Sequence, residues 1–157
     1  MSIEFVNETE AEADAEQMVA CTRFVLDAMH LHPETDVAVT LIDPEEMARL
    51  HVEWMDLEGP TDVMSFPMDE LRPGQPGSRT GAGVLGDVAI CPQVAAEQAA
   101  AQGHSAQDEM LLLLTHSLLH LMGFDHDSDE ARTEMFALQD RLLTAFLGRP
   151  APKATTA

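Results

Sequence analysis

Hydrophobic positions along the chain follow two spacings, one typical of helices and one typical of strands. Helical spacing predicts helices over residues 13–29, 44–54, 92–102, 105–122 and 127–147. Short β-branched runs between turn residues predict strands over residues 36–42, 62–66 and 85–91, and residues 2–6 alternate weakly, as an edge strand would. We therefore expect an α+β fold, with a small four-stranded sheet packed on helices.

Cap and turn residues refine the ends of these elements. Ser105, followed by Asp108 three positions later, predicts the start of the fourth helix, and Asp127 with Glu130 fits the same pattern before the last helix. Residues 68–84 hold two prolines and four glycines. This composition predicts a mobile surface loop of the kind that often borders a functional site.

The longest apolar stretch runs from Met110 to Met122 and is interrupted by polar residues. It is too short to span a bilayer, and the first ten residues have neither the basic start nor the apolar run of a signal peptide. We expect no membrane partner. No repeat or linker divides the chain, so residues 1–147 are expected to form one domain around a central helix, with residues 148–157 as a disordered tail.

Charge and cysteine content restrict the partners and the compartment. The chain has 157 residues, of which 45% are hydrophobic, and a formal net charge of -20. So large an acidic excess argues against broad phosphate binding, so any nucleic acid must be held locally, by a metal or by a few arginines. Cys21 and Cys91 form no CxxC pair, which favours a reduced, cytoplasmic compartment and buried thiols.

The segment HSLLHLMGFDH carries the strongest chemical signal in the chain. His116 and His120 are one helical turn apart, about 40° of rotation and about 6 Å of rise, so both imidazoles project from one face. Gly123 provides a backbone that can end the helix, after which His126 can turn back toward the pair. Three imidazoles leave the fourth position of tetrahedral zinc open, which is the catalytic arrangement.

Two observations bear on this prediction. A polar group buried without a partner costs about 1–3 kcal/mol, and a metal explains why two histidines interrupt a leucine-rich helix. A closed structural site would need a fourth protein ligand, and the sequence leaves Cys21 or Cys91 open for that role. The remaining histidines lie beside turns or on polar faces and are expected to be surface residues: His30, His32, His51 and His104.

The same spacing occurs in metzincin proteases, H-E-x-x-H-x-x-G-x-x-H. Their glutamate, the general base, is Ser117 here, which argues against a peptidase. A metal that lowers the pKa of bound water suits phosphodiester hydrolysis as well as acyl transfer. Asp87, Asp125 and Asp127 are candidate proton acceptors or hydrogen-bond partners of the imidazoles.

The histidine segment resembles the signature H-G-x-L-H-L-x-G-Y-D-H of the YbeY-type endoribonucleases. GPTDVMSFPMDE (residues 59–70) and LGDVAIC (residues 85–91) match two further blocks of that family in the right order. The resemblance extends from about Val37 to the final helix. It implies an α+β fold with the metal helix beside a small sheet, and one Zn²⁺ per chain held by His116, His120 and His126.

The resemblance also implies an activity and partners. Members are single-strand-specific endoribonucleases that help to mature the 3′ end of small-subunit ribosomal RNA and act in ribosome quality control. The expected partners are therefore ribosomal RNA and the ribosome or a small-subunit ribosomal protein. The family blocks place Ser65 near the metal cleft and Asp87 on the adjacent strand.

One departure from the family concerns catalysis. Many members have an arginine where this chain has Met55, and methionine offers no donors to a phosphate. Arg49, Arg72 and Arg79 are the nearest replacements in sequence. Two alternatives follow: a non-catalytic ribosome assembly factor with a structural metal, and a metal hydrolase of another substrate class.

Overall fold

The computed structural model describes residues 2–55 and 61–153. Their elements, in chain order, are β1 (Ile3–Asn7), α1 (Ala15–Ala28), β2 (Asp36–Leu41), α2 (Pro44–Met55), β3 (Val63–Pro67), β4 (Val84–Ile90), α3 (Pro92–Gln102), α4 (Ala106–Leu121) and α5 (Asp129–Leu147). Each agrees with a predicted element to within a few residues. The α+β prediction is confirmed.

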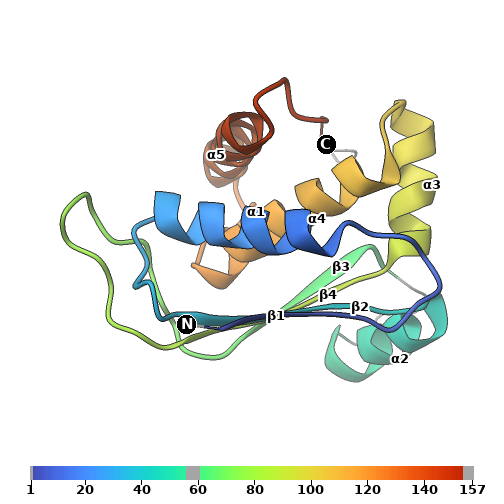
Figure 1. Cartoon of the computed structure of the whole chain (residues 1–157), viewed down its shortest axis with the longest axis horizontal. Helices are drawn as coiled ribbons and strands as arrows, with labels where there is room; N and C mark the ends of the chain where they lie inside the picture. Colours follow the sequence, from blue (N-terminus) through green and yellow to red (C-terminus); the bar gives the residue numbers. More distant parts are fainter. Residues whose placement is uncertain (1, 56–60, 154–157) are drawn as a thin grey trace.

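The four strands form one mixed sheet in the order β1-β2-β4-β3. β1, β2 and β4 are parallel, and β3 runs antiparallel to β4. Figure 1 shows α1 and α4 on one face of this sheet and α2 on the other. The sheet therefore separates two apolar clusters, a large one under α1 and α4 and a small one around Met47 of α2.

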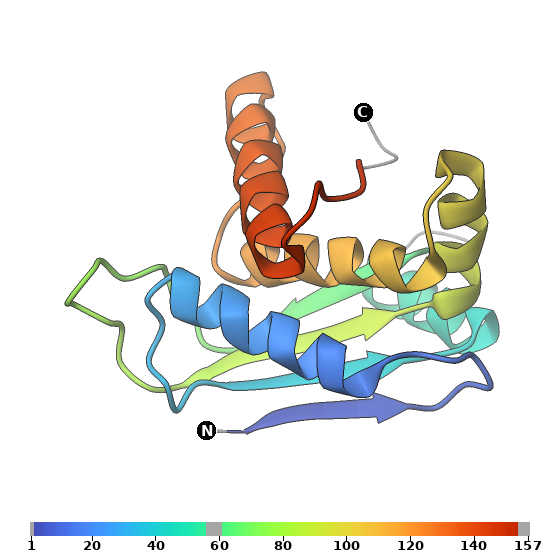
Figure 2. The same ribbon diagram turned by 45° about the horizontal axis from the view of Figure 1, so that its top comes forward.

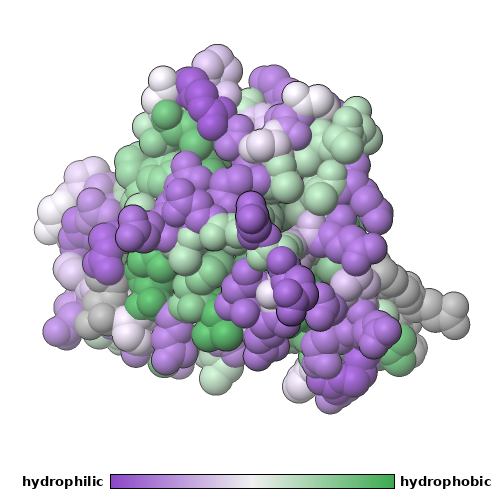
Figure 3. Space-filling view, turned by 45° about the vertical axis from the view of Figure 1, so that its right-hand side comes forward, coloured by the Kyte–Doolittle hydropathy of each residue, from purple (hydrophilic) through white to green (hydrophobic). Residues whose placement is uncertain are grey.

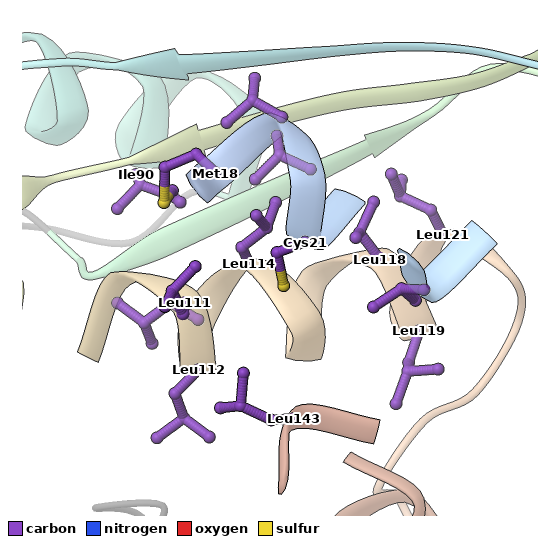
Figure 4. Close-up of a cluster of buried hydrophobic side chains, with 14 of the residues drawn as sticks. Met18, Cys21, Ile90, Leu111, Leu112, Leu114, Leu118, Leu119, Leu121 and Leu143 are labelled. Atoms are coloured by element: carbon purple, nitrogen blue, oxygen red, sulfur yellow. The ribbon is translucent and has the colours of Figure 1, made fainter. Parts of the chain in front are cut away.

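The helix α4 is central, as the apolar pattern predicts. It contacts α1, α3, α5, β3 and β4, and α5 runs across it on the side away from the sheet (Figure 2). Its leucines are almost completely buried and meet Met18 and Cys21 of α1, Ile90 of β4 and Leu143 of α5 (Figure 4). This packing holds α4 rigidly against the sheet, so polar residues on its remaining face have fixed positions.

Serine side chains cap both C-terminal helices. Ser105 Oγ accepts a hydrogen bond from the backbone N–H of Asp108 at 3.0 Å, as predicted. The predicted cap at Asp127 is wrong by one residue, because Ser128 Oγ accepts from the N–H of Ala131 at 3.1 Å. The backbone N–H of Asp127 instead donates to the Asp125 carboxylate at 3.2 Å.

The loop over residues 68–84 and the start of the predicted tail both contact the body of the protein. Gly74 N–H donates to the carbonyl of Met29 at 3.0 Å, which ties the loop to the end of α1. The Arg149 guanidinium pairs with the Asp108 carboxylate at 2.8 Å, and Ala151 is buried. Order therefore extends past residue 148, where we expected a disordered tail, and residues 154–157 lie outside the described residues.

The surface mixes hydrophilic residues with hydrophobic patches, as Figure 3 shows for one face. Among the described residues, Trp54 and Met68 are the most exposed large hydrophobic side chains. No helix in the described ranges is long and apolar enough to cross a membrane.

Candidate metal centre

Three histidine side chains converge beside the C-terminal end of α4. His116 and His120 come from the helix, and His126 comes from the segment that joins α4 to α5. One ring nitrogen from each lies within 4.8 Å of the others, and the Nε2 atoms of His116 and His120 are 3.1 Å apart. We refer to these three residues as the histidine cluster. The spacing argument for its assembly agrees with this geometry.

The turn after α4 brings His126 back to the helix. Gly123 has φ +99°, a backbone conformation in which any residue with a side chain would be strained. Its N–H donates to the carbonyl of His120 at 3.0 Å, and the next N–H, from Phe124, donates to Leu119 at 3.1 Å. A Cβ at Gly123 would also come within 2.7 Å of Arg72 Nε. Glycine is therefore required here for two reasons, the positive φ of the backbone and the close approach of Arg72 from the loop over residues 68–84.

Gln139 of α5 orients the imidazole of His116. His116 Nδ1–H donates to Gln139 Oε1 at 2.7 Å, and Gln139 is 3% exposed. Since an amide oxygen can only accept, Nδ1 carries the proton and the lone pair of His116 lies on Nε2, which faces His120. This is the arrangement that metal-binding histidines adopt, with a second hydrogen bond fixing the tautomer and the ring orientation.

Burial keeps the helical imidazoles neutral. It lowers the pKa of His116 to about 4, and the neighbouring His120 and His126 act in the same direction, against the hydrogen bond to Gln139. Burial, assisted by His126, also lowers the pKa of His120. Two neutral nitrogen donors face each other at neutral pH, so the site is prepared for a cation without first losing protons.

The histidine cluster opens into a cavity of about 640 Å³ between α4, α5 and β3. Ser65 of β3 lines it and forms a hydrogen bond with Ser117 of α4. Ser117 is fully buried and its hydroxyl is occupied by this bond. The residue at the position of the protease base therefore joins the sheet to the metal helix.

Comparison with known proteins agrees with this site. A family model described as Endoribonuclease YbeY matches residues 3–147. A protein of that name from Renibacterium salmoninarum is 56% identical over 157 residues, which cover 100% of both chains. Another, from Micrococcus luteus, is 56% identical over 155 residues, covering 99% of this chain and 98% of the relative. The chain belongs to the YbeY endoribonuclease family.

A solved structure shares the YbeY fold seen here. The solution structure of a Thermotoga maritima protein superimposes with a TM-score of 0.64 at 22% identity, covering 94% of this chain and 90% of that one. At this identity the likeness concerns the fold alone. The family itself consists of endoribonucleases, hydrolases that cleave phosphodiester bonds within RNA.

Asp87 does not join the histidine cluster of this YbeY chain. It is exposed and is not among the residues that line the cavity. On β4 it pairs with Phe66 of β3, whereas Ser65 pairs with Val88, one register position away. Because side chains alternate between the faces of a sheet, Ser65 faces α4 and Asp87 faces the side of α2. Asp87 therefore lies on the face of the sheet opposite to the histidine cluster.

The cysteines, which the sequence left open as a fourth ligand, lie elsewhere. Cys21 packs in the core against Thr115, with Sγ 3.7 Å from Oγ1, and burial raises the pKa of this thiol to about 11. Cys91 belongs to the small cluster under α2. Within the described ranges no cysteine or carboxylate joins the three histidines.

Several residues of the site are not evident from the sequence. Arg132, Phe136 and Gln139 of α5 line the cavity, at spacings of four and three that place them on one helical face. His51 also lines it. The side chain of His104 is only 13% exposed and pairs with Glu109, so the expectation that His104 is a surface residue is wrong. The sequence offers one signal of this part of the site. The polar Gln139 lies on the same helical face as the buried Met135, Leu142 and Leu143.

Two of the three arginines named as replacements at Met55 form ion pairs elsewhere, and the third, Arg72, lies against Gly123 and does not line the cavity. The side chain of Met55 and residues 56–60 lie outside the described part of the chain. Arg49 pairs with Glu46 and Glu53 on the exposed side of α2, and Arg79 pairs with Asp27 at 2.7 Å. Neither lines the cavity of the histidine cluster.

Proposed function

We propose that this chain is a zinc-dependent, single-strand-specific endoribonuclease. Its place of action would be the cytoplasm, in maturation of the 3′ end of small-subunit ribosomal RNA and in ribosome quality control. The observation that carries the proposal is the histidine cluster, whose ligand nitrogens lie within 4.8 Å of one another and face a cavity. Membership of an endoribonuclease family directs this chemistry toward RNA.

The residues of the site would have different roles in this reaction. His116, His120 and His126 would hold one zinc ion, which supplies a Lewis acid that activates water and polarises a phosphate. Gln139 holds His116 in the tautomer that presents Nε2. The bond between Ser65 and Ser117 keeps β3 beside α4. An unpaired RNA strand would enter the cavity between them, where its backbone would approach the site without a partner strand.

The charge of the chain bears on its substrate. With a formal net charge of -20, the protein repels a free polyanion at long range. We infer that the enzyme meets its RNA on the ribosome, held by a basic protein of the small subunit. This arrangement supplies locally the electrostatic attraction that the chain itself lacks.

The proposal is tested with purified protein and RNA of defined structure. Zinc-loaded wild-type protein should cleave a single-stranded oligonucleotide and leave the corresponding duplex intact. His120→Ala should lose at least about a hundredfold in rate, since it removes a ligand of the metal that acts in the transition state. His32→Ala, which replaces a histidine outside the lining of this cavity, is the matched control and should retain full activity.

The cellular role needs its own test. Cells that carry only His120→Ala should accumulate small-subunit ribosomal RNA with an unprocessed 3′ end, and cells with His32→Ala should not. Wild-type cleavage by purified His120→Ala would contradict the metal-centred reaction. Normal 3′ ends in the His120→Ala cells would contradict the role in ribosomal RNA.

A further inference from the structure

Arg132 places a guanidinium in the wall of the metal cavity. The residue lies in the first turn of α5 and is half-buried, and it lines the cavity together with the three histidines. Its guanidinium carbon is 5.5 Å from the centroid of the Phe136 ring. That ring lies 6.3 Å from the ring of His126, at an interplanar angle of 29°. The cation is thus stacked on the same aromatic wall as a ligand of the metal site.

No carboxylate neutralises this cation. Acidic residues surround Arg132 in the sequence, at positions 125, 127, 129, 130 and 134, yet among the described residues none forms an ion pair with it. Arg49, Arg79 and Arg149, by contrast, are all paired with carboxylates. Arg72 and Arg141 likewise form no ion pair among the described residues, but of these three arginines only Arg132 lines the cavity of the histidine cluster.

We infer that Arg132 binds a phosphate group of the RNA strand next to the metal site. This inference rests on the proposed nuclease function. Stacking on Phe136 fixes the plane of the guanidinium and leaves its edge N–H groups free. A phosphodiester offers two oxygens that match this fork, so the contact is bidentate and positions the strand at the histidine cluster.

The position on α5 explains why the sequence did not reveal this residue. The position that carries an arginine in many members is Met55, the last residue of α2, about eighty positions earlier in the chain. Arg132 lines the cavity of the histidine cluster because α5 crosses α4 (Figure 2). A contact between two helices of this kind is not evident from the spacing of residues along the chain.

The test compares two variants at this site with one control on the same helix. Arg132→Gln keeps a polar chain and removes the charge, and Arg132→Lys restores the charge without the fork. Arg141→Gln is the control, since Arg141 is exposed and lies nine residues further along α5, on its opposite side. All three change residues outside the zinc ligands, so zinc content and thermal unfolding should match those of the wild type.

Binding of a fluorescein-labelled, twelve-nucleotide single-stranded RNA to the zinc-loaded proteins is measured by anisotropy at several salt concentrations. Arg132→Gln should raise Kd about tenfold and should make the slope of log Kd against log salt shallower by about 0.7, the value for one contact to a single strand. Arg132→Lys should recover part of the affinity. Arg141→Gln should bind with the wild-type affinity and slope.

The outcomes separate this inference from the proposed function. RNA binding by Arg132→Gln that equals that of Arg141→Gln overturns the role of Arg132, whether or not the wild type cleaves RNA. Absence of RNA binding by every protein, the wild type included, overturns it as well. If binding depends on Arg132 but the wild type leaves the RNA intact, the phosphate contact stands and the nuclease proposal fails.

Discussion

The hydrogen bond from His116 to Gln139 makes a sharp prediction about metal affinity. Gln139→Leu keeps a side chain of similar size in a position that is 3% exposed and removes the acceptor 2.7 Å from Nδ1. The imidazole then loses the contact that fixes its tautomer and its orientation. The donor Nδ1–H is left buried without a partner, which costs about 1–3 kcal/mol.

Orienting contacts of this type change metal affinity by about 10–100-fold when they are removed. For Gln139→Leu this corresponds to about 1.4–2.8 kcal/mol of binding free energy, at about 1.4 kcal/mol per tenfold. The assay is competition for zinc between the protein and a chromophoric chelator, with the same titration on the wild type. Unfolding of the zinc-free proteins, measured in parallel, separates lost affinity from lost stability.

Gln139→Glu is the matched control because a carboxylate also accepts from Nδ1–H. We expect it to bind zinc at least as tightly as the wild type, since negative charge beside the imidazole strengthens the ligand. If Gln139→Leu and the wild type compete equally well with the chelator, Gln139 does not orient His116 toward a metal. The reasoning from this hydrogen bond would then be wrong.

Three further predictions concern the turn, the core and the pH dependence. Gly123→Ala and Gly148→Ala each place a side chain on a backbone with positive φ, and each should lower the free energy of unfolding by about 1–2 kcal/mol. Only Gly123→Ala should also weaken zinc binding in the chelator competition. Leu118→Ala should lower the urea unfolding free energy by about 2–5 kcal/mol, because Leu118 is fully buried. In zinc-free protein the pKa of His116 is about 4 in the folded state, against 6.5 for an ordinary histidine. Below pH 6.5 the unfolded chain therefore binds more protons than the folded protein does. Stability is therefore lost as the pH falls, by about 2 kcal/mol from pH 7 to 5, and His116→Gln should lose that much less.

The helices and strands could be predicted because local patterns determine them. The leucine-rich pattern of α4 requires burial on nearly every side, and the four-residue spacing of His116 and His120 fixes their common face on any α-helix. Gly123 then predicts the end of the helix, because glycine adopts the required positive φ more easily than other residues. These three signals are independent of the rest of the fold, and together they predict the histidine cluster.

The remainder of the site depends on how distant segments meet. Ser65 and Asp87 lie on adjacent strands, but the register of β3 on β4 turns one toward α4 and the other away. Arg132 and Gln139 become part of the site only because α5 crosses α4 at the histidines. No local pattern encodes such contacts between elements.

The claim that three histidines form an open metal centre is tested most directly by X-ray absorption spectroscopy of the zinc-loaded protein. The structure predicts three imidazole nitrogens and one oxygen from water, all at about 2.0–2.1 Å, and one zinc ion per chain. A sulfur ligand at about 2.3 Å, or fewer than three imidazoles, would contradict an open catalytic site at His116, His120 and His126.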